Sequence, residues 1–202
     1  MLVPKGIAMR EFILPIANCC ALFAVPTHRG QLPTNSSYTE MKIRNMNPDD
    51  WPAVREIYEE GIATKMATFE TSAGTWEKWD QGHLAEPRLV MTKGEEVLGW
   101  AALSRVSGRC VYGGVAEVSV YIRASAKGRG IGTLLLEELI RRSEENGIWT
   151  LQAGIFADNH PSIKLHEKVG FRLVGTREKL GRLDGVWRDI VLMERRSDVA
   201  GV

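Results

Sequence analysis

The order of apolar and polar residues divides most of the chain into segments with strand-like or helix-like spacing. Alternation with a period of two is typical of strands with one buried face. It predicts strands over residues 41–46, 88–92, 97–103, 115–122, 149–155, 171–177 and 187–194. Apolar residues three and four positions apart are typical of helices with one buried face. They predict helices over residues 47–62, 75–84, 130–146 and 159–169.

Residues at the ends of these segments fit the predicted helices. Asn47 followed by Pro48 is typical of a helix start, and Asn146-Gly147 and Gly170 are typical of helix ends. A group of antiparallel strands precedes a strand–helix–strand–helix–strand series, which predicts an α/β (α+β) fold with one mixed sheet. In the helix over residues 130–146, the spacing places four apolar side chains inward: Ile131, Leu134, Leu135 and Leu139.

The composition narrows the function only by exclusion. The chain has 202 residues, of which 44% are hydrophobic and 25% are charged, and its formal net charge is +1. This balance gives no general attraction to nucleic acid or to an anionic membrane, so neither is an expected partner. The three cysteines form no disulfide framework and lack zinc-ligand spacing, so no metal site is expected.

Residues 1–40 differ from the rest of the chain, because they carry few charges and include the pair Cys19-Cys20. Their apolar run is too short and too interrupted to cross a membrane, which needs about 20 apolar residues. We expect an upstream stretch with Met41 as the natural start; a disordered extension and a targeting segment are the alternatives. The folded domain is expected over residues 41–196, followed by a tail over residues 197–202.

A glycine-rich segment between a predicted strand and the longest predicted helix is the most specific local motif. It reads Lys127-Gly128-Arg129-Gly130-Ile131-Gly132. Glycine permits backbone conformations that a side chain forbids, and the free N–H groups of a helix N-terminus bind anions. The motif lacks the Gly-Lys-Ser/Thr ending of a P-loop and the glycine spacing of a dinucleotide fingerprint. It predicts a pyrophosphate site; a plain turn with solvated charges is the alternative.

Further motifs follow the glycine loop in a fixed order. After the long helix and the next strand come Asn159 and then Leu165-His166-Glu167-Lys168-Val169-Gly170-Phe171. This order resembles the GCN5-related N-acetyltransferase (GNAT) superfamily, and residues 116–122 and 161–167 are similar to its phosphinothricin and methionine-sulfoximine acetyltransferase branch. The resemblance covers residues 41–195. It implies the GNAT fold, a mixed and mostly antiparallel central sheet flanked by helices.

The resemblance implies acetyl-CoA as cosubstrate and indicates the residues that bind it. The glycine loop is implied to hold the pyrophosphate. The strand that carries Val120, Tyr121 and Ile122 is implied to bind the pantetheine arm through its backbone, as an added strand does. Asn159 and, more weakly, Ser162 are implied contacts of the same arm. Asn159 also has the position of a plain helix N-cap, and both interpretations are compatible.

Glu117 is the expected general base. The amine of an amino acid is mostly ammonium at neutral pH and must lose a proton before it attacks a thioester. The period of two puts Glu117, Ser119 and Tyr121 on one face of their strand. A carboxylate within an apolar strand is costly unless it has a partner or a function. An edge-strand glutamate that faces water is the alternative.

The resemblance also indicates a second catalytic residue and an acceptor pocket. His166 stands where many superfamily members have a tyrosine that protonates the leaving thiolate, and it is expected to act as an acid or as a polar orienter; a structural histidine is the alternative. Arg109, Tyr112 and Phe69 match acceptor-site residues, with the Arg109 guanidinium suited to a carboxylate. A solvated loop charge is the alternative for Arg109. Cys110 has no evident histidine partner, so no acyl-enzyme is expected.

Together these features predict an acetyl-CoA-dependent N-acetyltransferase. The expected acceptor is the α-amine of a small L-amino acid or analogue, of the phosphinothricin or methionine sulfoximine/sulfone type, and the expected mechanism is direct transfer in a ternary complex. A protein N-terminus, a polyamine or an antibiotic amine is the alternative acceptor, and a non-catalytic acyl-CoA-binding module is the alternative class. A cytoplasmic homodimer is expected, since relatives of this kind are commonly dimers.

Overall fold

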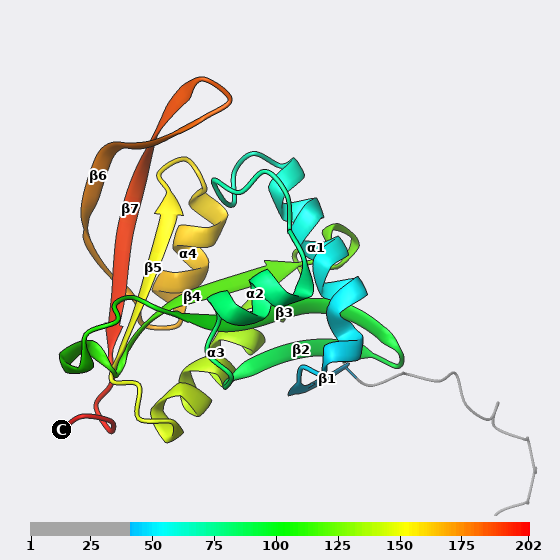
Figure 1. The fold of residues 1–202 in the computed structure, drawn as a ribbon, viewed down its shortest axis with the longest axis horizontal. Helices are drawn as coiled ribbons and strands as arrows, with labels where there is room; N and C mark the ends of the chain where they lie inside the picture. Colours follow the sequence, from blue (N-terminus) through cyan, green and yellow to red (C-terminus); the bar gives the residue numbers. More distant parts are fainter. Residues whose placement is uncertain (1–40) are drawn as a thin grey trace, which may run out of the picture. The chain divides into compact units, whose positions relative to one another are not determined.

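The computed structural model describes residues 41–202; the expected extension over residues 1–40, with Cys19 and Cys20, lies outside the described part. Within that part, seven strands form one sheet in the order β1-β2-β3-β4-β5-β7-β6 (Figure 1). Neighbouring strands are antiparallel except β4 and β5, which are parallel. The strands are β1 (Met41–Asn45), β2 (Arg88–Lys93), β3 (Glu96–Arg105), β4 (Val115–Ile122), β5 (Thr150–Phe156), β6 (Arg172–Leu183) and β7 (Val186–Arg196).

Helices cover both faces of the sheet (Figure 1). The α-helices of residues 41–202 are α1 (Trp51–Ala63), α2 (Trp76–Gly82), α3 (Ile131–Glu145) and α4 (His160–Lys168). Single 3-10 turns are η1 (Pro48–Asp50), η2 (Cys110–Tyr112) and η3 (Ala124–Ala126). All helices in this part of the chain are too short or too polar to span a lipid bilayer.

Strand β3 shows how the sheet divides the core into two layers. Leu98 and Leu103 pack on one face with Leu135 of α3. Trp100 packs on the other face with Ile57 of α1. All five of these side chains are nearly inaccessible to water. Residues 97–103 of β3 are therefore buried on both faces of the sheet, and the predicted mixed sheet flanked by helices is confirmed.

The structure corrects one residue of the predicted helix pattern. The helix predicted over residues 130–146 is α3, with Gly130 as its N-cap residue. Leu134 was expected inward but is 43% exposed. At 100° per residue, Leu136 and Ile140 lie on the buried side of α3 and Leu134 lies on the opposite side. Apolar character alone therefore placed this residue on the wrong face.

The last two strands are longer than the sequence predicts. The strand predicted over residues 171–177 continues to Leu183, and the strand predicted over residues 187–194 begins at Val186. Strands β6 and β7 therefore form one long hairpin. Its turn residues Asp184 and Gly185 both have positive φ, at 47° and 83°. An Asp-Gly pair is a favoured two-residue hairpin turn. Strand β6 forms the free edge of the sheet, and the hairpin continues the sheet past the end of β5 (Figure 1).

Candidate active site

Strands β4 and β5 pair at one end only and then separate. Their parallel pairing covers Val115 with Thr150, Ala116 with Leu151 and Glu117 with Gln152. Beyond these residues β4 remains paired with β3, and β5 remains paired with β7. The backbone groups of β4 that face the gap therefore have no partner strand there, and such groups must be satisfied by water or by a ligand.

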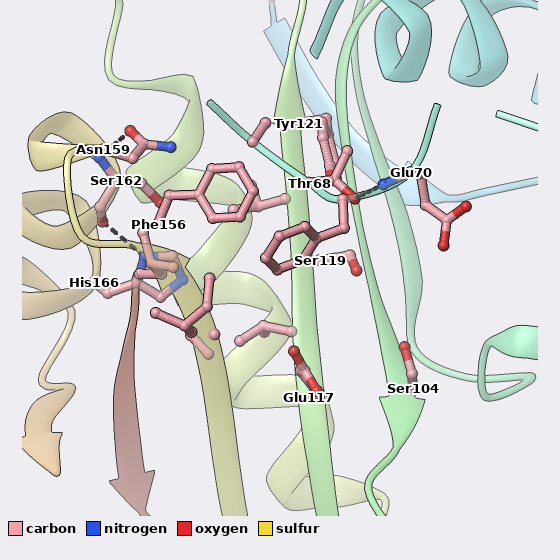
Figure 2. Close-up of a pocket in the computed structure, with 18 of the residues that line it drawn as sticks. Thr68, Glu70, Ser104, Glu117, Ser119, Tyr121, Phe156, Asn159, Ser162 and His166 are labelled. Carbon is pink, nitrogen blue, oxygen red and sulfur yellow. Dashed lines mark hydrogen bonds between the residues drawn. The ribbon is translucent and has the colours of Figure 1, made fainter. Parts of the chain in front are cut away.

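A cavity of about 420 Å³ fills the gap between the two strands (Figure 2). Figure 2 shows Glu117 and Ser119 on β4 on one side and Ser162 and His166 on α4 on the other. The cavity brings together seven of the residues that the sequence singled out: Phe69, Glu117, Val120, Tyr121, Asn159, Ser162 and His166. It thus joins the expected base, the expected second catalytic residue and part of the expected cofactor strand.

Glu117 lies at the point where the pairing ends. Its side chain is reachable by solvent, yet the cavity walls remove enough water around the carboxylate to raise its pKa above the usual value. A hydrogen bond from the backbone of Gly154 and the positive charge of Arg177 lower the pKa by less than this burial raises it. A carboxylate with a raised pKa, open to a cavity, is suited to accept a proton from a bound amine.

His166 is buried, with 3% of its surface exposed. Its Nδ1 lies 2.8 Å from the carbonyl oxygen of Ser162, and burial lowers its pKa. Because a carbonyl oxygen only accepts, Nδ1 carries the hydrogen, and the neutral ring then presents Nε2 as an acceptor. The ring also packs edge-on against Phe171, at 5.1 Å between centroids. This geometry favours a neutral orienting group over a proton donor.

Asn159 occupies the N-cap position of α4. Its side-chain oxygen accepts a hydrogen bond from the backbone N–H of Ser162 at 3.3 Å, as the N-cap interpretation requires. Its Nδ2 donates to the carbonyl oxygen of Met66 at 2.9 Å. Asn159 therefore connects α4 to the loop after α1 and still lines the cavity. The oxygen retains a lone pair that a ligand N–H can use.

The glycine loop lies at the start of α3, where the sequence predicts it. Gly128 and Gly130 have φ of 77° and 78°, a region that L side chains rarely adopt. The first helical bond runs from Leu134 N to Gly130 O, which leaves the N–H groups of residues 131–133 without intrahelical partners. Lys127 and Arg129 are exposed beside these N–H groups. The arrangement fits a pyrophosphate group.

Gly132 serves packing instead of a special backbone conformation. A Cβ at Gly132 would lie 3.0 Å from Leu165 of α4, so the absent side chain lets α3 and α4 approach closely. Ile122, at the end of β4, packs into the core layer that contains α3 and does not line the cavity. The predicted cofactor residues therefore lie in three places. Residues 127–132 form the glycine loop, Val120 and Tyr121 line the cavity, and Ile122 packs in the core.

Tyr121, which the sequence analysis singled out, forms one wall of the cavity together with Tyr58 and Thr68, which it missed. The rings of Tyr58 and Tyr121 meet at 4.7 Å between centroids, and both side chains line the cavity together with Thr68. Burial raises the pKa of both tyrosines, which keeps them protonated. Tyr121 packs so closely on α1 that a Cβ at Gly61 would lie 2.6 Å from its ring. Tyr58 follows the helical spacing of α1, so the sequence indicated only its packing.

The hairpin of β6 and β7 supplies further lining residues that the sequence did not indicate. Arg177 and Leu180 of β6 both line the cavity. Phe69, on the loop after α1, packs on Phe156 at 4.8 Å between centroids, and its ring approaches the backbone of Gly181. The expected pocket-lining role of Phe69 is consistent with this position, and the contact brings the loop and the hairpin together.

Arg109 and Tyr112 lie elsewhere. Arg109 directly precedes η2, and Tyr112 is its last residue. Cζ of the Arg109 guanidinium lies 5.6 Å from the centroid of the Tyr112 ring. Neither residue lines the cavity, and the exposed Cys110 beside them does not line it either. Their expected role in acceptor binding stays a prediction. Within residues 41–202, no three His, Cys, Asp or Glu side chains gather as a metal site requires.

Comparisons with known proteins agree with this geometry. The family model described as "Acetyltransferase (GNAT) family" matches residues 43–171. YwnH of Bacillus subtilis, named as a candidate phosphinothricin acetyltransferase, is 36% identical over 160 residues, which cover 77% of this chain and 98% of YwnH. An L-methionine sulfoximine/L-methionine sulfone acetyltransferase of Pseudomonas aeruginosa is 30% identical over 171 residues, which cover 77% of this chain and 94% of that protein.

A solved structure supports the same assignment. A GNAT superfamily phosphinothricin acetyltransferase from Sinorhizobium meliloti, in complex with acetyl-CoA, superposes with a TM-score of 0.72 and 28% identity over 80% of this chain and 90% of that one. Such a neighbour supports acetyl-CoA as the cosubstrate of this chain too. From the family match, the similar relatives and the cavity between β4 and β5, we conclude that this chain belongs to the GNAT family and is an N-acetyltransferase.

Proposed function

We propose that the enzyme acetylates the α-amine of a small L-amino acid or analogue, of the phosphinothricin or methionine sulfoximine/sulfone type, by direct transfer in a ternary complex. The observation that carries this proposal is the Glu117 carboxylate, which lies in the cavity between β4 and β5 with Arg177 as a nearby positive charge. The activities for which the similar relatives are named support the substrate class.

The chain has a suitable site for acetyl-CoA. Lys127, Arg129 and the free N–H groups at the start of α3 are suited to the pyrophosphate, and the unpaired edge of β4 is suited to the amides of the pantetheine arm. When bound, acetyl-CoA supplies an acetyl group as a thioester, so that the amine nitrogen gains a bond to the acetyl carbon, the carbon–sulfur bond breaks and the thiol leaves with one proton.

Glu117 is the proposed general base. An ammonium group held at the carboxylate transfers a proton to it, directly or through one water, and becomes a nucleophilic amine. The raised pKa makes the Glu117 carboxylate more basic than an ordinary glutamate. It therefore accepts a proton from an ammonium group more readily. Backbone N–H groups around Val120, on the edge of β4 that faces the gap, are the proposed donors to a carbonyl oxygen in the cavity.

His166 is proposed to orient a group in the cavity. Protonation of Nε2 would create a buried imidazolium, and burial already lowers the pKa of this ring. The neutral ring accepts a hydrogen bond at Nε2, from a thiol or from a water molecule. Its hydrogen bond to the carbonyl oxygen of Ser162, one turn earlier in α4, fixes the orientation of the ring.

A homodimer is also part of the proposal. Leu173 on the edge strand β6 is 58% exposed, and Val186 and Trp187 in the same hairpin are 58% and 55% exposed. Apolar side chains of this size on a free sheet edge favour an interface with a second copy. Sedimentation velocity with the wild type and with Trp187→Glu tests it: a dimer that the substitution weakens supports the interface, and a wild-type monomer contradicts it.

A panel of amines with acetyl-CoA and detection of the released thiol tests the function. We expect the highest kcat/KM for free amino acids such as phosphinothricin, methionine sulfoximine and methionine sulfone. A peptide with a free N-terminus, spermidine and an aminoglycoside represent the alternative acceptors. Higher kcat/KM for any of those three than for every amino acid would contradict the proposal, and acetyl-CoA binding without thiol release from any amine would favour a binding module.

A further inference from the structure

Arg177 is the one lysine or arginine among the described residues that line the cavity. Its side chain is exposed to the cavity and makes no ion pair or hydrogen bond within residues 41–202, where most other arginines have such partners. The two histidines of the lining, His83 and His166, have lowered pKa values because burial disfavours their charged forms. Arg177 is therefore the permanent positive charge of this cavity.

An irregularity in β6 directly after Arg177 brings Leu180 to the same side of the strand as Arg177. The pairing of β6 with β7 shifts between Arg177 and Gly181, and Lys179 within the shift has a φ of 47°. The backbone N–H of Lys179 donates to the Asp189 carboxylate at 2.7 Å, which holds this conformation. In a regular strand, residues three apart point to opposite faces. The shift lets Arg177 and Leu180, three residues apart, face the same cavity.

We propose that Arg177 binds the carboxylate of the acceptor amino acid and thereby determines the preference for free α-amino acids over amines without a carboxylate. The inference rests on the function proposed above. Guanidinium groups bind carboxylates through two parallel hydrogen bonds, which fixes orientation as well as position. Arg177 and Glu117 line the same cavity of about 420 Å³, so one small ligand can contact both groups.

The covalent structure of an α-amino acid matches this pair of charges. Its amine and its carboxylate are attached to the same carbon, so an ammonium at Glu117 leaves the carboxylate on the side of Arg177. The side chain of the acceptor then has an apolar surface available, formed by Phe69, Phe156 and Leu180. A polyamine or an aminoglycoside has no anionic group for Arg177 and would place a second cation near it.

The test compares methionine sulfone with its α-carboxamide, which keeps the amine and the side chain and removes the negative charge. In Arg177→Gln, we expect KM for methionine sulfone to rise about 10- to 100-fold, the effect of losing a charge-assisted hydrogen-bond pair. KM for the carboxamide should change less than about threefold, and the Kd of acetyl-CoA should not change. Arg177→Lys should restore part of the affinity, because lysine keeps the charge but not the paired geometry.

Two further measurements make the result independent of turnover and of folding. The Kd of methionine sulfone in the presence of coenzyme A, measured by calorimetry, should weaken in Arg177→Gln by the same factor as KM. Arg182→Gln is the matched control, because Arg182 lies on the same strand, donates to the Gly185 carbonyl oxygen and does not line the cavity. It should keep the wild-type KM and Kd.

The outcomes separate this inference from the function on which it rests. Equal losses for methionine sulfone and its carboxamide in Arg177→Gln, or no loss for either, would overturn the role of Arg177 while the wild type still acetylates amino acids. A selective loss in Arg109→Gln instead would place the carboxylate at the η2 loop and also overturn it. A wild type that acetylates no amino acid would overturn the proposed function itself.

Discussion

Glu117 on β4 and Gly154 on β5 face each other at the point where the two parallel strands stop pairing. A Cβ at Gly154 would lie 3.3 Å from Oε1 of Glu117 and 3.5 Å from Cγ2 of Ile190. The missing side chain at Gly154 gives the carboxylate its room, and the backbone of the same residue favours its charged form. One glycine therefore both admits the proposed base and influences its pKa.

Gly154→Ala tests this relationship. The added methyl group crowds Oε1, so we expect kcat for methionine sulfone to fall about 10- to 100-fold, as small misplacements of catalytic groups do. The Kd of acetyl-CoA and the thermal midpoint should change little. Gly175→Ala on β6 is the control, since nothing lies within 4 Å of its Cβ position. A wild-type kcat in Gly154→Ala would mean that this contact does not position the carboxylate.

The glycine loop gives a second prediction. An alanine at Gly130 must adopt a φ of 78°, which costs an L residue about 1–2 kcal/mol. For a domain of this size, 1 kcal/mol lowers the thermal midpoint by about 2–4 °C. We also expect weaker binding of acetyl-CoA by calorimetry, because the strain is relieved by moving the N–H groups of α3. Gly82→Ala, in open space and without a positive φ, should leave both quantities unchanged.

Stability should depend on pH through His166. Its pKa is lowered by burial, so the unfolded chain binds more protons than the folded one as the pH falls below about 6.5. The free energy of unfolding is therefore retained at higher pH and falls on acidification, by at most about 1.4 kcal/mol per pH unit for this group. Replacement by asparagine, whose amide can still donate to Ser162, should flatten the decrease; the exposed His160→Gln should not. Identical slopes for the wild type and His166→Asn would contradict the prediction.

Much of the site could be predicted because its residues carry local signals. The period-two pattern of β4 correctly separates Glu117 and Tyr121 from Val118 and Val120, which pack toward α3. The N-cap position of Asn159 is likewise a local property of the start of α4. Each of these features depends on residues that are neighbours in sequence, so the pattern alone was sufficient.

The parts that escaped prediction depend on contacts between distant segments. Nothing in β4 or β5 alone indicates where their pairing ends, because that is determined by the registers with β3 and β7. The strand predicted over residues 171–177 ends at Arg177, so the irregular continuation of β6 that completes this side of the cavity was not predicted. Asp184-Gly185 was the available signal for the long hairpin, since this pair favours a two-residue turn.

Glu117→Gln gives the most direct test of the proposed function. The measurement is kcat/KM for acetylation of methionine sulfone from pH 5 to pH 8, with calorimetry of acetyl-CoA binding as the check on folding. In the wild type we expect activity to fall on the acid side through a pKa above the usual glutamate value. In the variant we expect kcat to drop about 100- to 10,000-fold, the usual contribution of a general base, with unchanged Kd for acetyl-CoA. The control Glu137→Gln, on the exposed face of α3, should behave as the wild type. Wild-type turnover by Glu117→Gln at neutral pH would contradict the assignment of this carboxylate as the base.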